Sequence, residues 1–152
     1  MASNAEARVP GLQEFNNFGF PDILSERVAI EKAASNFALD NAQGFVQRFE
    51  RVARASRVVP LEEDVWSKLE NTDSYQVGKG EWSKVRQATF KSGNGSDWKD
   101  IKGLVETGNT VDAPIILKVG DRVHLVSGNT RLMVCHAMGV TPGVLIVDMS
   151  GE

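Results

Sequence analysis

A short segment, Ser-Gly-Asn-Thr-Arg, has the composition of an anion-binding corner, and we call it the glycine-arginine box. Gly128 allows the backbone to turn sharply and to approach a ligand closely. If a helix begins here, its first N–H groups have no intrahelical partner and carry a partial positive charge. Ser127, Asn129 and Thr130 add hydroxyl and amide groups, and the Arg131 guanidinium can hold a phosphate or carboxylate through two parallel hydrogen bonds. The box therefore predicts a phosphate site that needs no metal from the protein. The alternative is a capped helix whose arginine pairs with a nearby carboxylate.

The neighbouring residues predict elements that place the box between a strand and a helix. The Gly120-Asp121 pair supplies the positive φ of a tight turn, so the segments on either side are predicted to form a β-hairpin. Gly139 closes the helix that follows the box, and Gly108 closes an earlier helix capped by Ser96 or Asp97. The predicted elements of this half are helices at 97–108 and 132–139 and strands at 114–119, 122–126 and 143–148.

The first part of the chain has a weaker pattern. Residues 1–20 predict an irregular lead-in whose Phe15, Phe18 and Phe20 dock onto the core. Apolar residues at helical spacing then predict two helices, the second capped by Asp40 or Asn41, and Pro60 is expected to end the helical stretch. The other predictions are helices at 21–38, 41–56 and 61–69, an irregular region at 71–97 and a loop at 92–96.

Basic residues gather on the predicted helix at 41–56, where Arg48, Arg51, Arg54 and Arg57 fan across one face. A helix lying on a core needs a solvated face, and arginine is a good helix former. The same face is a candidate for contacting nucleic-acid phosphates through Arg48, Arg51 and Arg54. Further on, aromatic residues alternate with basic ones, which suits either a core or stacking on single-stranded nucleic acid. These aromatic residues are Tyr75, Trp82, Phe90 and Trp98.

Composition narrows the class of protein. A chain of 152 residues with 41% hydrophobic and 24% charged residues is typical of one compact domain. Its net charge of −3 argues against non-specific nucleic-acid binding. The apolar runs are too short to cross a bilayer, and the first residues lack the basic and apolar regions of a signal peptide. The single cysteine fits a reducing compartment. We therefore expect a cytoplasmic protein without a membrane partner. Cys135 is expected to face the core, and His124 and His136 lack spaced partners for a metal site.

The stretch APIILKVGDRVHLVSGNTRLMVCHAMGVTPGVLIVDM, within residues 97–149, resembles the ParB/sulfiredoxin-like family in the order of its strand, hairpin, box, helix and closing strand. Small phage-encoded proteins carry this domain in similar form. The family binds nucleotide phosphates with its box: CTP in partition proteins, and ATP in sulfiredoxins and in kinases of free serine. The resemblance implies that Gly128 and Arg131 bind the phosphates of ATP or CTP with Mg²⁺. It also places Ser127, Asn129 and Thr130 at phosphate-contacting positions.

The chain departs from the family pattern at three points. Asn129 stands where sulfiredoxins have their reactive cysteine, so repair of sulfinic acids is not expected. Asn129-Thr130 replaces the Glu-Arg pair of many partition proteins, and no helix-turn-helix domain follows. Ser127 replaces the acidic residue of the kinases, and the acidic residues nearest in sequence are Glu106, Asp112 and Asp121.

Together these features predict an α+β fold: a small mixed sheet with flanking helices, in which residues 1–95 form a helical and irregular extension packed on a core at 96–152, as one unit. The expected function is binding of a nucleotide or other phosphate ligand, by a phosphotransferase or nucleotide hydrolase in nucleic-acid metabolism. One alternative is a non-catalytic adaptor that binds nucleic acid or protein. Another is a ParB-like nuclease, although the sequence has no clustered carboxylates for it. The sequence specifies neither turnover nor an oligomeric state.

Overall fold

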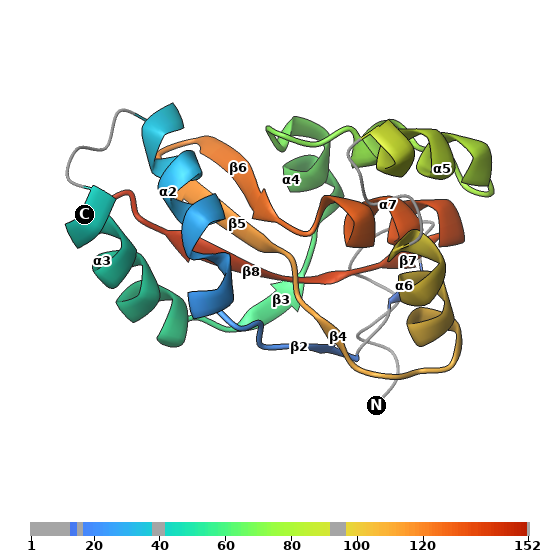
Figure 1. Cartoon of the computed structure of the whole chain (residues 1–152), viewed down its shortest axis with the longest axis horizontal. Helices are drawn as coiled ribbons and strands as arrows, with labels where there is room; N and C mark the ends of the chain where they lie inside the picture. Colours follow the sequence, from blue (N-terminus) through green and yellow to red (C-terminus); the bar gives the residue numbers. More distant parts are fainter. Residues whose placement is uncertain (1–12, 15–16, 38–41, 92–96, 152) are drawn as a thin grey trace.

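A four-stranded mixed sheet runs through the middle of the molecule (Figure 1). In this computed structural model, the described residues are 13–14, 17–37, 42–91 and 97–151. The strand order is β3-β8-β5-β6, in which β5 runs antiparallel to β6 and parallel to β8, and β3 runs antiparallel to β8. The strands are β3 (Val58–Pro60), β5 (Ile115–Val119), β6 (Arg122–Ser127) and β8 (Gly143–Asp148).

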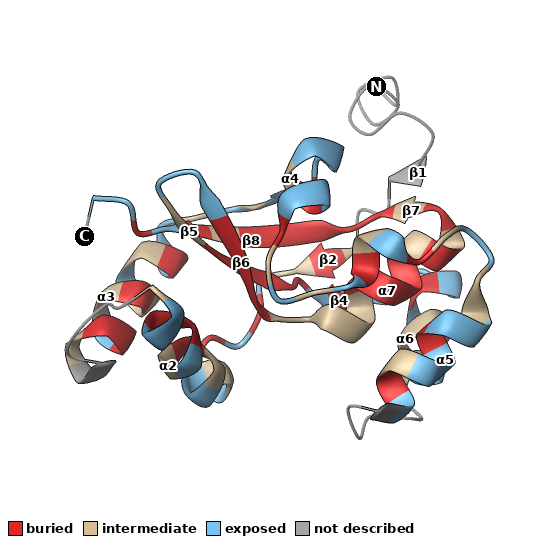
Figure 2. Ribbon diagram, turned by 90° about the horizontal axis from the view of Figure 1, so that it is seen from above, coloured by how far each residue is buried: buried red, intermediate tan, exposed pale blue. Residues whose placement is uncertain are grey.

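Helices cover both faces of this sheet, because successive side chains of a strand point to opposite faces. Ile115 and Leu117 belong to a core with the helices α2 (Arg27–Asn36) and α3 (Ala42–Arg54). Ile116, between them in sequence, faces a second core that includes Trp66 and Leu132. Figure 2 shows the buried residues concentrated along the sheet and on the helix faces that meet it.

The second face carries the helices that surround the box. Those involved are α4 (Glu63–Lys68), α5 (Trp82–Lys91), α6 (Asp97–Glu106) and α7 (Asn129–Met138), together with the 3-10 helix η2 (Ser74–Gln76). A third buried cluster joins α5 and η2 to α7 through Val77, Val85 and Met133. Another 3-10 turn, η1 (Leu24–Glu26), precedes α2.

Two pairs of short strands connect the N-terminal segment to this framework. β1 (Gln13–Glu14) pairs in parallel with β7 (Val140–Thr141), and β2 (Phe18–Gly19) pairs in parallel with β4 (Val111–Asp112). Residues 1–20 were expected to be irregular, and two-residue strands of this kind leave no periodic signal in a sequence. Phe18 is buried as predicted, whereas Phe20 is 44% exposed, and Phe15 lies outside the described residues.

The structure confirms the α+β class, the small mixed sheet and the flanking helices. The predicted hairpin, the box helix and the closing strand are present, and Gly108, Gly120 and Gly139 all have positive φ. One local prediction is wrong, because the region 71–97 contains α5, whereas the helix predicted at 41–56 is present as α3 and the chain is no longer helical at Pro60. The predicted caps at Asp40, Asn41 and Ser96 and the loop at 92–96 lie outside the described residues.

Residues before 96 also contribute to the central sheet. Val58–Pro60 pair with β8 as an edge strand, and the Leu61 N–H donates to the Pro142 carbonyl at 2.9 Å. The sequence expectation assigned the sheet to the C-terminal strands alone. A three-residue strand after a long amphipathic helix is too short to show a period of two.

Candidate functional site

The glycine-arginine box forms the junction between β6 and α7. Gly128 has φ 112° and ψ 20°, a conformation that favours glycine. A Cβ atom added at this position would lie 2.5 Å from the Pro114 Cβ and 2.8 Å from its Cα, so neither the backbone angle nor the space admits a side chain. The Leu132 N–H closes the first helical turn by donating to the Gly128 carbonyl at 3.0 Å. The turn is therefore fixed by Gly128 and Pro114.

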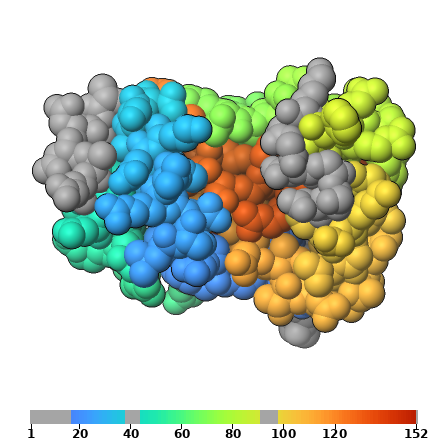
Figure 3. All heavy atoms as spheres, viewed as in Figure 1, coloured from blue at the N-terminus to red at the C-terminus, as the bar shows by residue number. Residues whose placement is uncertain are grey.

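The start of α7 has no side-chain cap. Among the described residues, none accepts a hydrogen bond from the backbone N–H of Thr130 or Arg131. Unpaired N–H groups at a helix start carry the positive end of the helix dipole and attract anions. In the space-filling view an orange-red part of the chain is visible between the blue surface of α2 and the gold surface of α6 (Figure 3).

Arg131 lies beside these amides and is held by uncharged groups. Its guanidinium donates to the Asp112 carbonyl at 2.7 Å and to the Ser127 hydroxyl at 3.2 Å. Among the described residues, no carboxylate lies within ion-pair distance of it. Burial lowers the pKa of Arg131, and the nearby charges of Glu26 and Asp112 oppose this effect. The arginine is thus positioned by a carbonyl and a hydroxyl, and no described carboxylate forms an ion pair with it.

Asn129 has a different part in the site. Its side-chain oxygen accepts a hydrogen bond from the Thr72 hydroxyl, which in turn hydrogen-bonds the Ser74 hydroxyl at 2.8 Å. The indole N–H of the buried Trp66 donates to the same Ser74 hydroxyl at 2.8 Å. Sequence analysis did not identify this network, although a run of turn-forming residues at 71–74 was a signal for it. Asn129 anchors the loop that precedes η2 against the box.

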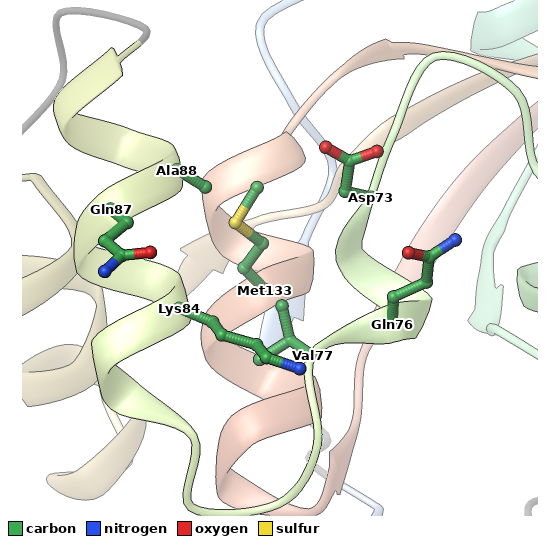
Figure 4. Close-up of a pocket in the computed structure, with 7 residues that line it drawn as sticks. All are labelled: Asp73, Gln76, Val77, Lys84, Gln87, Ala88 and Met133. Carbon is green, nitrogen blue, oxygen red and sulfur yellow. The ribbon is translucent and has the colours of Figure 1, made fainter.

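A hollow of about 350 Å³ opens beside α7, between this helix, η2 and α5 (Figure 4). Met133 lies one helical turn after Asn129, so the hollow begins on the Asn129 side of the box. Its walls combine apolar and polar side chains, which are Val77, Ala88, Met133, Asp73, Gln76, Lys84 and Gln87. Polar side chains make up the larger part of this lining, and Val77, Ala88 and Met133 form its apolar part.

The arginines of α3 do not lie near the box. Figures 1 and 2 show α3 and α7 toward opposite ends of the sheet. Arg54 forms an ion pair with Glu50 at 2.8 Å, the Arg48 guanidinium lies 5.9 Å from the centre of the Phe45 ring, and Arg51 is exposed. They remain candidates for contacting nucleic acid on a separate surface.

The structure also shows the burial and the contacts of the other candidate residues from the sequence. Cys135 is fully buried as predicted, and burial raises the pKa of its thiol to about 12. His136 contacts the Val77 carbonyl and the Trp66 ring. Among the described residues, no group of three or more metal-binding side chains is present. Glu106 pairs with Lys102 at 2.7 Å, and Asp121 is an exposed residue of the hairpin turn.

Of the four aromatic residues that alternate with basic ones in the sequence, three contact other aromatic rings and Phe90 is largely exposed. The rings of Trp82 and Trp98 stack on each other with centres 5.6 Å apart, and Tyr75 lies 6.2 Å from Trp66. Phe90 is 76% exposed. The stacked tryptophans are partly buried where α5 meets α6.

No protein-family model, curated protein or solved structure matches the chain. Within the described ranges, no helix has the length and apolar character needed to span a bilayer.

Proposed function

We propose that the chain binds a nucleotide through its phosphates at the β6–α7 junction. The observation that carries this proposal is the combination of an uncapped helix start, a left-handed Gly128 packed on Pro114, and an Arg131 that pairs with no described carboxylate. Helix N-termini with a close-approaching glycine bind phosphate in many unrelated folds. The resemblance to the ParB/sulfiredoxin-like family adds support from the sequence, and it favours ATP or CTP accompanied by Mg²⁺.

The two sides of the junction suit different parts of a nucleotide. Arg131 lies toward Asp112 on one side, and the hollow at Met133 lies on the other. Phosphates bound at the start of α7 would have the guanidinium on one flank, while the nucleoside would occupy the hollow. Val77 and Met133 would contact the base, and Asp73, Gln76 and Gln87 could hydrogen-bond polar groups of the nucleoside.

The reaction class that fits this arrangement is transfer of a phosphoryl group to an acceptor or to water, in nucleic-acid metabolism. Such reactions depend chiefly on positioning and on stabilising charge at the phosphoryl oxygens. The N–H groups of Thr130 and Arg131 and the Arg131 guanidinium would supply that stabilisation.

Isothermal titration calorimetry with ATP, CTP and ADP in Mg²⁺ tests the proposal. We expect saturable binding of at least one nucleotide and a loss of affinity of at least about tenfold in Arg131→Ala, because a charged hydrogen bond contributes about 1.5–3 kcal/mol. Arg51→Ala removes the same charge from the far end of the sheet and should bind normally. Circular dichroism confirms that each variant is folded. Absence of binding by the native chain, or equal loss in both variants, would refute the proposal, and salt-sensitive oligonucleotide binding that depends on Arg51 would instead favour the adaptor.

A further inference from the structure

A buried histidine on β6 belongs to none of the contacts described above. His124 is 6% exposed on β6, and its Nδ1 lies 3.5 Å from a carboxylate oxygen of Glu70. Because a carboxylate only accepts hydrogen bonds, the shared proton is placed on Nδ1. In this tautomer Nε2 carries no proton and can accept a hydrogen bond. Among the described residues, nothing hydrogen-bonds to Nε2.

Several contacts hold this pair in place. Arg122 donates two hydrogen bonds to the Glu70 carboxylate, at 2.9 Å and 2.7 Å, which lower the pKa of that carboxyl and keep it charged. The Glu70 backbone is hydrogen-bonded to Val123 and Leu125, on either side of His124. Phe37 contacts the imidazole edge-on with ring centres 5.6 Å apart, and the Arg122 guanidinium lies 4.2 Å from the centre of the same phenyl ring. The imidazole is therefore fixed from several directions, as is common for histidines that act on a ligand.

His124 lines a hollow of about 460 Å³ between α2 and β6. Lys32 stands at this hollow with no carboxylate within ion-pair distance among the described residues. The side-chain amides of Asn36 and Asn71 donate to the backbone, at the Lys32 and Leu125 carbonyls, which leaves their oxygens as acceptors. Ala29, Ala33 and Val126 supply small apolar walls.

These groups define the chemistry of a ligand. Lys32, which pairs with no carboxylate in the described part of the chain, suits an anionic group, whereas the imidazole nitrogen and the two amide oxygens suit O–H or N–H donors. The small apolar walls suit C–H groups rather than an aromatic ring. We propose that this hollow is a second binding site, which takes a small polyol phosphate with its anionic group at Lys32 and a hydroxyl donating to His124 Nε2. The proposal does not depend on nucleotide binding at the glycine-arginine box, because the two sites share no residue.

The chain contains only two histidines, so NMR of the imidazole signals gives a direct test. The probe is glycerol 3-phosphate, compared with inorganic phosphate, which lacks the hydroxyls, and glycerol, which lacks the charge. We expect glycerol 3-phosphate to shift the His124 signals saturably while those of His136 stay in place. Inorganic phosphate and glycerol should each bind at least about fivefold more weakly, since each loses hydrogen bonds of about 1 kcal/mol or more.

Variants separate this site from others. Lys32→Gln, an exposed substitution, should weaken glycerol 3-phosphate binding at least about tenfold. Lys99→Gln, on exposed α6 surface, and Arg131→Ala should leave the His124 response unchanged. The proposal is overturned if His124 does not respond, if both histidines shift alike, if Lys32→Gln binds as tightly as the native chain, or if inorganic phosphate binds as tightly as glycerol 3-phosphate.

Discussion

Replacing Gly128 by alanine should destabilise the protein strongly, for two reasons that can be measured apart. A residue with a side chain in a left-handed conformation costs about 1–2 kcal/mol, and φ at this position is 112°. The new Cβ would also lie 2.5 Å from the Pro114 Cβ and 2.8 Å from its backbone Cα, so β5 or the turn must move. Overpacking of this kind costs about 1–3 kcal/mol. The sum is about 2–5 kcal/mol, which lowers Tm by about 10 °C in a chain of this size.

Gly120→Ala is the matched control. Gly120 also has a positive φ, 61°, but a Cβ there would meet nothing within 4 Å. It should cost only about 1 kcal/mol, and the difference between the two variants in urea-induced unfolding measures the contact with Pro114. If Gly128→Ala is no less stable than Gly120→Ala, the box is not held by Pro114 and this account of its geometry is refuted.

Four other outcomes follow from the structure. Ala88→Phe, which fills the hollow beside α7, should weaken nucleotide binding about tenfold or more in calorimetry yet leave tripolyphosphate binding unchanged; equal effects on both ligands would remove the nucleoside from that hollow. Ser74→Ala strips the buried Trp66 indole of its acceptor and should cost about 1–3 kcal/mol in thermal unfolding, whereas a change below about 0.5 kcal/mol would contradict the network. The Arg122 hydrogen bonds hold the pKa of Glu70 below its ordinary value in the folded chain, so the ion pair stabilises the protein above the ordinary carboxyl pKa and this stability is lost as pH falls through the native pKa. Glu70→Gln should therefore flatten the acid limb of the plot of unfolding free energy against pH. An unchanged limb would refute this. With its pKa raised to about 12, the Cys135 thiol should resist iodoacetamide at pH 8 until the chain unfolds, and alkylation of the native protein within minutes would show that the thiol is accessible.

The C-terminal half was predictable because its signals are local. Gly120, Gly128 and Gly139 mark a turn, a helix start and a helix end, and each has the positive φ that its position requires. The alternating and apolar runs between them predict strands directly. The residues of the box were therefore identified from the sequence, and the structure places them at one corner, although Asn129 is turned toward Thr72.

The parts that sequence analysis missed depend on contacts between distant segments. α5 packs on α7 through Val85 and on α6 through Trp82, and neither contact has a local signature in the sequence. β3 is an edge strand whose pairing with β8 has no local signature. The Glu70–His124 pair joins residues far apart in the chain, and a lone histidine on a strand gives no indication of such a partner. These features arise from the tertiary arrangement.

The central claim is that the backbone N–H groups at the start of α7, which have no partner among the described residues, receive a phosphate. The most direct measurement is the ¹⁵N–¹H spectrum of the native chain during titration with tripolyphosphate and then with ATP and CTP. The account predicts that the amide signals of Thr130 and Arg131 move most, move saturably, and move little in Arg131→Ala. Large shifts elsewhere with these two amides unmoved would contradict it.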